Sequence, residues 1–405
     1  MVSARDDLVA KVVPALATVP AAAWDACANP DPTCHNPFLS YAFLSALELA
    51  GCAVAAKGWA PQHIVLERGG NVIGCLPLYL KSHSRGEYVF DTGWADAYAR
   101  AGGDYYPKLQ AAVPFTPVPG RRLLIHPDAD TAETELLLNA AARDLARRLG
   151  ASSVHATFTT EGEWQRLGAA GLLQRTDQQF HWHNQGYRTF EDFLAGLASR
   201  KRKTVRKERA TALAPGLAIE HVLGRDITEA HWDAFFKFYT DTGSRKWGSP
   251  YLNRKFFSLL GAAMRERCLL VLAKRGGRYI AGALNLIGGD TLYGRYWGAI
   301  EHHACLHFEV CYYQAIEYAI AHGLKRVEAG AQGEHKLARG YLPATTYSVH
   351  WIADPSLKRA VAKYLEGERR YVAEMGAALA EQGPYRKGAP GSVEGEVCSL
   401  ADEQD

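Results

Sequence analysis

The chain has 405 residues, a net charge of +3, 48% hydrophobic residues and 22% charged residues. This length exceeds what one hydrophobic core usually supports, so two domains are expected, and the composition excludes a largely disordered chain. The small net charge excludes a generally basic nucleic-acid-binding surface, so any basic patch has to be local.

Residues 1–35 are predicted to be an amino-terminal extension. Their alanine-rich part contains Pro14 and Pro20 and starts with few basic residues, unlike a signal peptide. The chain has no apolar run long enough for a membrane-spanning helix, so stable membrane insertion is not expected and the predicted location is cytoplasmic. The eight cysteines lack paired spacing, which predicts reduced, mostly buried thiols and no disulfide framework.

Two stretches of the chain repeat one order of elements. Residues 63–80 and 269–287 each predict a strand, an Arg-Gly-Gly turn and a second strand. A helix follows in each half, over 133–149 and 308–322, and each half then has a strand, a turn and a segment ending in His-Trp. The repetition predicts a duplicated α/β unit. The first copy is about 40 residues longer, and we assign the extra residues to 86–122.

A basic connector is predicted between the copies, over residues 185–214, with Thr189 as a helix N-cap. Residues 199–209 hold seven cations and one acid, which favours an anionic partner, with a solvated charged face as the alternative. Aromatic residues do not interleave with the cations, so base-specific readout is not expected. The residues predicted to bind the phosphates of a carrier are Arg202, Lys203, Arg206 and Lys207.

Residues 244–251 follow a predicted aromatic core helix and are expected to form an irregular loop. Their two cations and two aromatic residues suit the lip of a substrate site. The histidines at 302, 303 and 307 lack a second ligand pair, so no metal site is predicted. The phosphate-loop, dinucleotide and serine-hydrolase motifs are not found, which disfavours those chemistries. The substrate-binding residues predicted in this loop are Arg245, Trp247 and Tyr251.

The most chemically dense stretch is residues 306–351. The predicted helix ends at Gly323, and a strand over 324–330 leads into a loop crowded with charged side chains. Ligands of α/β sheets bind beyond strand ends, so a site is predicted here, with a solvated turn as the alternative. The predicted catalytic residues are Glu309, Tyr312, Glu334, His335 and Lys336. The predicted substrate-binding residues are Arg295, Gln332 and Arg339.

The carboxy-terminal part is predicted to be a helix over 354–382, packed on the second copy. The following tail, residues 388–405, is small, acidic and aperiodic, which is typical of disorder. The predicted domains are 36–184 for the first copy and 215–387 for the second.

The chain resembles the FemAB-like branch of the GNAT acyltransferase superfamily, a group often labelled peptidoglycan biosynthesis or recognition proteins. The resemblance spans residues 36–384, and it implies an α/β (α+β) fold with tandem duplicated GNAT-like domains. Each domain is expected to be a mixed, mostly antiparallel sheet flanked by helices. The strongest marks of the resemblance are residues 36–39, 58–63, 76–81, 199–202, 243–248 and 330–340.

In the similar Fem transferases, a helix with a Tyr-x3-Ile-x2-Ala-x3-Gly pattern leads to a strand and then to a Phe-Lys pair in the acceptor cleft. Tyr312 or Tyr313, with Ile316, Ala319 and Gly323, fits that helix here, and His335-Lys336 stands where Phe-Lys would be. The long coiled-coil arm of many Fem enzymes has no counterpart. The Gln/Arg-x-x-Gly-x-Gly/Ala loop of coenzyme-A-using GNAT proteins is not found either.

The resemblance implies transfer of an acyl or aminoacyl group from an activated carrier to an amine. Aminoacyl-tRNA is slightly favoured as the donor, and the acceptor is an amine-bearing small molecule or a peptidoglycan precursor. No permanently bound cofactor is expected. An acyl-CoA-dependent N-acyltransferase and a non-catalytic module that binds cell-wall peptide or RNA are the alternatives.

The transfer needs a base, an oxyanion donor and cations for the carrier. Glu309 or Glu334 is the candidate base, with His335 as the competitor. Lys336 and Arg339 are expected to hold phosphate or to stabilise the oxyanion, and Tyr312 to return a proton to the leaving group.

Overall fold

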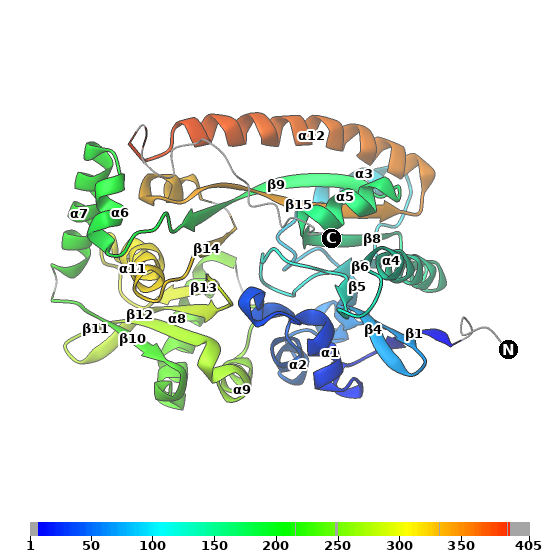
Figure 1. The fold of residues 1–405 in the computed structure, drawn as a ribbon, viewed down its shortest axis with the longest axis horizontal. Coiled ribbons are helices and arrows are strands. Elements are labelled where there is room, and N and C mark those ends of the chain that lie inside the picture. Colours follow the sequence, from blue (N-terminus) through cyan, green and yellow to red (C-terminus); the bar gives the residue numbers. More distant parts are fainter. Residues whose placement is uncertain (1–6, 215, 248–249, 332, 387, 389–405) are drawn as a thin grey trace.

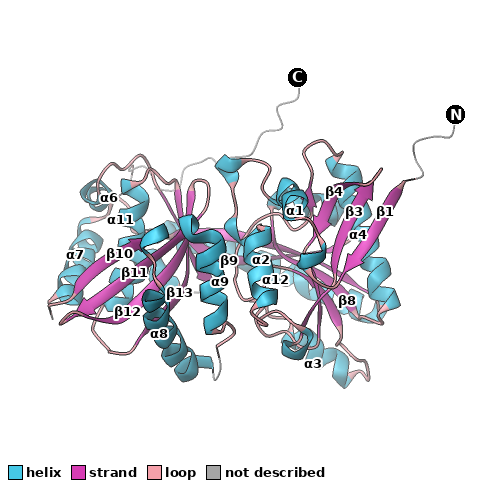
Figure 2. Ribbon diagram, turned by 90° about the horizontal axis from the view of Figure 1, so that it is seen from below, coloured by secondary structure: helices cyan, strands magenta, loops and turns pink. Residues whose placement is uncertain are grey.

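The computed structural model describes the chain except for residues 1–6, 215, 248–249, 332, 387 and 389–405. Figure 1 shows two halves side by side, with a long twisted sheet running through both and helices on its faces. Figure 2 shows the same sheet from below. The predicted tail lies, apart from residue 388, outside the described residues.

The long sheet contains eleven strands within the described residues. In spatial order they are β10 (Ala218–Leu223), β11 (Cys268–Arg275), β12 (Arg278–Ile287), β13 (Thr291–Ala299), β14 (Arg326–Ala331), β9 (Leu173–His183), β15 (Leu342–Ile352), β8 (Ser153–Thr159), β6 (Lys108–Ala111), β5 (Leu78–Lys81) and β2 (Trp59–Pro61). A smaller sheet has the order β1 (Leu8–Val13), β3 (His63–Arg68), β4 (Asn71–Leu76) and β7 (Leu124–Ile125).

Helices cover both faces of these sheets (Figure 1). They are α1 (Ala21–Ala28), α2 (Tyr41–Leu49), α3 (Thr92–Arg100), α4 (Thr131–Arg148), α5 (Glu161–Ala169), α6 (Phe190–Gly196), α7 (Ser199–Leu213), α8 (Glu229–Trp247), α9 (Arg254–Met264), α10 (Leu306–Phe308), α11 (Gln314–Ala321) and α12 (Pro355–Glu381). A π-helical segment, η7 (Glu309–Tyr313), joins α10 to α11. The 3₁₀ helices are η1 (Leu16–Thr18), η2 (Pro32–Cys34), η3 (Pro37–Leu39), η4 (Ala55–Lys57), η5 (Gly224–Asp226), η6 (Arg265–Arg267) and η8 (Glu334–Arg339).

The predicted duplication is confirmed in detail by the two hairpins. Gly69 and Gly70 turn β3 into β4 with φ of 57° and 80°, and Gly276 and Gly277 turn β11 into β12 with φ of 57° and 78°. Positive φ at both central residues is the two-residue turn whose twist matches antiparallel strands, and glycine adopts it without strain. Each copy then has a parallel strand pair joined through a helix: β6 and β8 around α4, and β13 and β14 around α10 to α11.

The two copies exchange their last strands. β9, from the first copy, pairs with β14 of the second, and β15, from the second copy, pairs with β8 of the first. β9 and β15 are also antiparallel neighbours of each other. The two copies therefore share the eleven-stranded sheet, while the β3–β4 hairpin of the first copy lies in the smaller sheet. The domain limits given above stay predictions.

The extra residues of the first copy are two insertions rather than one. Residues 82–107 precede β6 and include α3, and residues 112–130 follow it and include β7. The predicted insertion, 86–122, therefore wrongly included β6, which is the equivalent of β13. The segment expected to be an extension, residues 1–35, supplies α1 and also β1, which pairs with β3.

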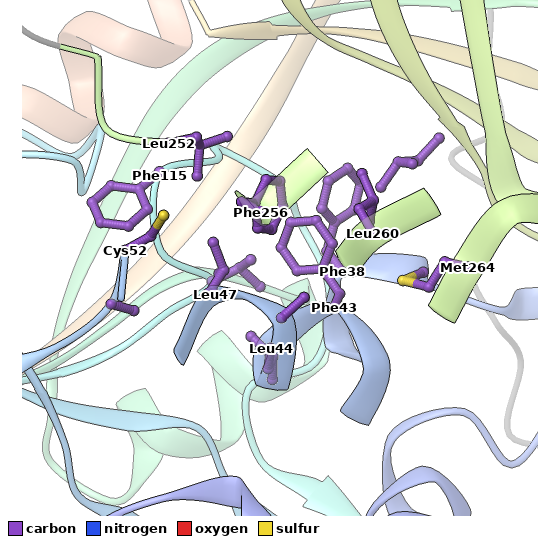
Figure 3. Close-up of a cluster of buried hydrophobic side chains, with 14 of the residues drawn as sticks. Phe38, Phe43, Leu44, Leu47, Cys52, Phe115, Leu252, Phe256, Leu260 and Met264 are labelled. Carbon is purple, nitrogen blue, oxygen red and sulfur yellow. The ribbon is translucent and has the colours of Figure 1, made fainter. Parts of the chain in front are cut away.

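An apolar core joins the halves where α2 meets α9 (Figure 3). The rings of Phe43 and Phe256 lie 5.7 Å apart, edge to face, and both side chains are fully buried. Phe38, Leu260 and Met264 are buried in the same core. Apolar burial of this kind holds the halves as one body.

The carboxy-terminal helix α12 is confirmed, with Asp354 as its N-cap. It does not pack on the second copy alone, because it lies along both exchanged strands, β9 and β15 (Figure 1). Its Glu368 accepts hydrogen bonds from Arg175 of β9 at 2.7 and 2.8 Å. Among the described residues, no helix combines the length and hydrophobicity needed to cross a membrane.

Candidate active site

The parallel pairing of β13 and β14, in the second copy, stops before either strand ends, and we call the region beyond the last pair the opening. These parallel strands pair from Thr291 to Tyr293 and from Arg326 to Glu328, and they separate beyond those residues although both continue. Separating strands expose backbone groups and leave room for a ligand at the sheet edge. The residues that follow β14, in η8, are those for which the sequence predicted a site.

The helix behind this opening is interrupted by a π-helical segment, η7, where the sequence predicts a continuous α-helix. Single π turns occur frequently at functional sites, because the wider turn redirects side chains. Here the segment places Tyr312 beside η8 and Glu309 against α7. The π turn thereby directs Glu309 and Tyr312, both predicted to be catalytic, to different neighbours.

Lys336 is the central residue of the candidate site. It lies in η8, between Gly333 (φ 104°) and Gly340 (φ 96°), and is 2% exposed. Its Nζ donates hydrogen bonds to the carbonyl oxygens of Gly330 at 3.1 Å and Ala331 at 3.3 Å. Burial, and secondarily the Arg295 cation, lower the pKa of Lys336 to about 7. A buried ammonium held by neutral carbonyls therefore stands at the end of β14.

Tyr312 and His335 form a hydrogen-bonded pair beside Lys336. The Tyr312 hydroxyl lies 3.0 Å from Nε2 of His335. Tyr312 is 4% exposed, and burial raises its pKa above the usual range, so it stays protonated. His335 is exposed. The pair offers a proton acceptor next to a proton donor.

A cavity of about 370 Å³ adjoins this pair. Phe308, in its wall, has its ring 5.8 Å from the His335 ring, and His307 lies 5.3 Å from the Tyr312 ring. Aromatic and cationic walls suit an aromatic, anionic ligand group. The cavity is lined by Thr242, Arg245, Trp297, Ala299, Glu301, His302, His303, Ala304, Cys305, Leu306, His307 and Phe308.

Arg245 lines this cavity from a helix, because the loop predicted over 244–251 is helical up to residue 247. Its guanidinium pairs with Asp241 at 2.5 Å, one turn earlier, and donates to the Ala299 carbonyl at 2.8 Å. The Ser244 hydroxyl bonds the Thr240 carbonyl at 2.7 Å. These local bonds continue the helix through residues that the sequence marked as a loop.

Other predicted residues of this region lie apart from the cavity wall. Tyr251 is 37% exposed and stacks on Phe115 with ring centroids 5.0 Å apart. Arg295 is buried and bonds Glu328 at 3.0 Å, inside the sheet. Gln332 and the side chain of Trp247 lie outside the described residues.

Glu309 does not face the opening, contrary to its predicted role as a base. It is fully buried, and Arg209 of α7 bonds both carboxylate oxygens, at 2.9 to 3.2 Å. Gln314 donates a further hydrogen bond at 2.7 Å. Glu334 is exposed on the first residue of η8. Glu334 therefore stays a candidate base by position, whereas Glu309 holds α7.

Arg339 is engaged within the protein rather than directed to a substrate. Its guanidinium bonds Glu208 of α7 at 2.7 and 3.1 Å and the His335 carbonyl at 2.6 Å. It also lies 3.4 Å from the centre of the Phe308 ring. The predicted phosphate or substrate contact of Arg339 has no support in this geometry.

The basic residues of α7 lie on different sides of the helix. Lys203 and Lys207 line an open hollow of about 470 Å³ together with Ser199, Arg200 and Thr204. Arg206 is exposed and pairs with Glu191 at 2.5 Å. Arg202 is half-buried near the start of the helix. The sequence grouped Arg209 with the outward cations, but its partners Glu309 and Glu317 turn it inward.

A second buried cluster of charged residues, which was not predicted, lies in the first copy. Lys108 of β6 bonds Glu87 at 2.7 Å and also Asp91, and all three side chains are at most 4% exposed. Lys81 of β5 lies 3.7 Å from Glu87 and 3.6 Å from the centre of the Trp59 ring. Burial lowers the pKa of Lys81 to about 7. The available signal was the alternation of Lys108 and Gln110 with apolar residues in β6.

The match to a family model covers residues 15–387, and the family is FemAB-like, described as peptidoglycan biosynthesis and recognition. A search of the curated proteins by sequence finds no significant match. The solved structure of FemX is 14% identical, with a TM-score of 0.54, and the match covers 85% of this chain and 98% of FemX. A tandem GNAT protein from clavulanic acid biosynthesis is also 14% identical, with a TM-score of 0.47, over 86% of this chain and 99% of that one.

The match to FemX over nearly the whole length of both chains agrees with the overall fold described above. The family and fold class predicted from the sequence are confirmed. The chain belongs to the FemAB-like family of peptidoglycan biosynthesis and recognition proteins, and it shares the fold of FemX.

Proposed function

We propose that this enzyme moves an acyl or aminoacyl group from an anionic carrier to an amine at the opening between β13 and β14. The observation that carries the proposal is Lys336, a buried ammonium at the strand end, which follows directly in the chain on His335 of the hydrogen-bonded pair with Tyr312. Amide formation needs a proton acceptor for the amine and a positive group for the oxyanion. These three side chains supply both.

In this mechanism the amine nitrogen attacks the acyl carbonyl carbon, and Lys336 donates a hydrogen bond to the oxygen that becomes negative. His335 takes the proton that the amine nitrogen loses. When the carbon–oxygen or carbon–sulfur bond to the carrier breaks, Tyr312 gives its proton to the leaving atom. His335 then returns a proton to Tyr312 across their 3.0 Å contact. One proton thus passes from the amine to the leaving group.

We propose aminoacyl-tRNA as the donor. The cavity wall residues His307 and Phe308 contact the reacting pair directly, so a terminal nucleoside bound there keeps its attached ester beside Lys336. In acyl-CoA a long arm separates the nucleotide from the thioester, and the nucleotide would have to lie further away. The outward cations of α7 suit an RNA backbone.

We propose a peptidoglycan precursor amine as the acceptor. The description of the family supports this substrate class. The exposed position of His335 leaves the base accessible to an amine carried on a large molecule.

A parallel titration with coenzyme A, acetyl-CoA and bulk charged tRNA tests the donor. We expect saturable tRNA binding whose affinity falls about tenfold or more between 50 and 200 mM salt, because several phosphates are neutralised. Filter binding measures the affinity, and thermal shift reports coenzyme A binding. Tight coenzyme A binding without tRNA binding would instead make this an acyl-CoA-dependent N-acyltransferase. Loss of turnover in variants that still bind RNA would exclude a simple binding module.

The pH dependence of kcat/KM tests the charge of Lys336. With a pKa of about 7, Lys336 is protonated below that pH and neutral above it. Because the charged form stabilises the oxyanion, kcat/KM is expected to descend as pH rises through about 7. Lys336→Arg keeps the charge and should move this descending limb to higher pH. A limb that ascends near pH 7 and vanishes in Lys336→Arg would mean that Lys336 is the base.

A further inference from the structure

Two adjacent residues of α7, Glu208 and Arg209, form ion pairs with the candidate active site. Glu208 contributes the negative charge of its pair, and Arg209 contributes the positive charge of its pairs. Glu208 accepts hydrogen bonds from Arg339 of η8 and from the Tyr313 hydroxyl. Arg209 donates to Glu309 of the π-helical segment and to Glu317 of α11. We name these contacts the α7 clasp. The clasp joins the basic helix to both structural parts of the site.

The α7 clasp lies largely out of solvent. The side chains of Glu309, Arg339, Glu208 and Arg209 are 0%, 8%, 16% and 21% exposed, respectively. Buried ion pairs are weak evidence for stability, because desolvation offsets their attraction, and their better-supported use is to set one register. Here the order of the two charges sets the register of α7. A shift of the helix by one residue would place Arg209 against Arg339 or Glu208 against Glu309. The clasp therefore specifies where α7 stands.

Arg339 links the clasp to the reacting groups. The same guanidinium that bonds Glu208 also bonds the His335 carbonyl at 2.6 Å and covers the Phe308 ring. Lys336 follows His335 in the chain, within the same short helix. A displacement of Glu208 therefore moves the backbone that carries the base and the oxyanion donor.

The opposite side of α7 presents cations to solvent. Arg200, Lys203 and Lys207 line the hollow of about 470 Å³, while Val205 and Ala212 are buried on the inner side. A polyanion that binds the hollow acts on a rigid helix. Its effect reaches the inner side without a change of fold.

We infer that α7 couples binding of a phosphate backbone, on its outer side, to the position of η8, on its inner side. Glu208 and Arg209 are the positioning residues in this coupling. The inference deepens the proposed function, because it assigns the RNA backbone of the carrier to the outer hollow. It also predicts a loop response that is measurable without turnover.

Amide hydrogen exchange of residues 333–341 tests the inference, with bulk deacylated tRNA as the probe. In the wild-type enzyme, saturating tRNA is expected to slow exchange of these amides about fivefold or more, because bound tRNA restrains α7 and the clasp transmits that restraint to η8. Glu208→Gln should bind tRNA with an affinity within about twofold of wild type. Its amides should lack the protection.

Glu191→Gln is the matched control, since it removes an exposed carboxylate that pairs with the same helix. It should retain wild-type protection. If Glu208→Gln does not fold, Tyr313→Phe removes the neighbouring hydroxyl contact alone and should weaken the protection.

Equal protection in wild type and Glu208→Gln overturns the coupling, as does tRNA binding without any protection. Absence of tRNA binding overturns it as well. Protection that depends on Glu208, in an enzyme that transfers nothing from charged tRNA, supports the coupling and overturns the proposed donor. The two failures are therefore distinguishable.

Discussion

Lys336→Met is expected to lower kcat by about 10²- to 10³-fold, the usual cost of removing one oxyanion donor. Methionine keeps an unbranched side chain of similar length and removes the ammonium, so the enzyme should still fold. Burial already disfavours the charged form of Lys336 in the wild-type protein, because it lowers the pKa of this residue to about 7. Loss of the charge should therefore cost little stability. Steady-state turnover with the donor identified by titration, together with a thermal melt, measures both effects.

Lys325→Met is the control for this variant. Lys325 precedes β14 on the same segment, its side chain is 81% exposed, and its contact with Asp290 at 3.6 Å is a surface pair. Surface pairs contribute about 0–1 kcal/mol, so neither turnover nor stability should change noticeably. Turnover of Lys336→Met within about twofold of wild type would remove Lys336 from the mechanism.

Lys108→Met is expected to be the most destabilising of the single substitutions discussed here. Lys108 and its partners Glu87 and Asp91 are at most 4% exposed, and Ser84 accepts a further hydrogen bond from Lys108 at 2.9 Å. Removing the ammonium leaves two carboxylates without their shared cation, at a cost of about 3–5 kcal/mol. Chemical denaturation measures the loss of unfolding free energy.

The exposed pair of Lys11 and Glu67 gives the comparison. Their contact is short, at 2.6 Å, but the Lys11 side chain is 52% exposed. Lys11→Met should cost about 0–1 kcal/mol. A Lys108→Met variant no less stable than Lys11→Met would mean that the buried carboxylates take up protons or water at almost no cost.

Local patterns predicted the elements that depend on local chemistry. The two Gly-Gly hairpins need positive φ, and the start of α6 is capped by Thr189 and Asp192 as the sequence indicates. Helix α12 begins after Asp354, as expected. Each of these features is decided by residues within a few positions of one another.

The features that the sequence failed to predict depend on distant partners. Glu309 was predicted to be a base because the sequence does not show that its ion-pair partner is Arg209, one hundred residues earlier. The buried cluster of Lys81 and Lys108 was not predicted, because its partners Glu87 and Asp91 lie in an insertion without a periodic pattern. The exchange of β9 and β15 was invisible, since a strand pattern shows the buried face and not the neighbour.

That exchange also indicates how such a chain arises and how it folds. Two identical subunits that trade their final strands form a swapped dimer, and joining the subunits end to end gives the order of strands seen here. The Nδ1 atoms of His155 and His350 lie 2.7 Å apart across the junction, and the two residues are 195 positions apart in the chain. Such pairing waits until residue 350 has left the ribosome, so neither half expressed alone should reach its native state.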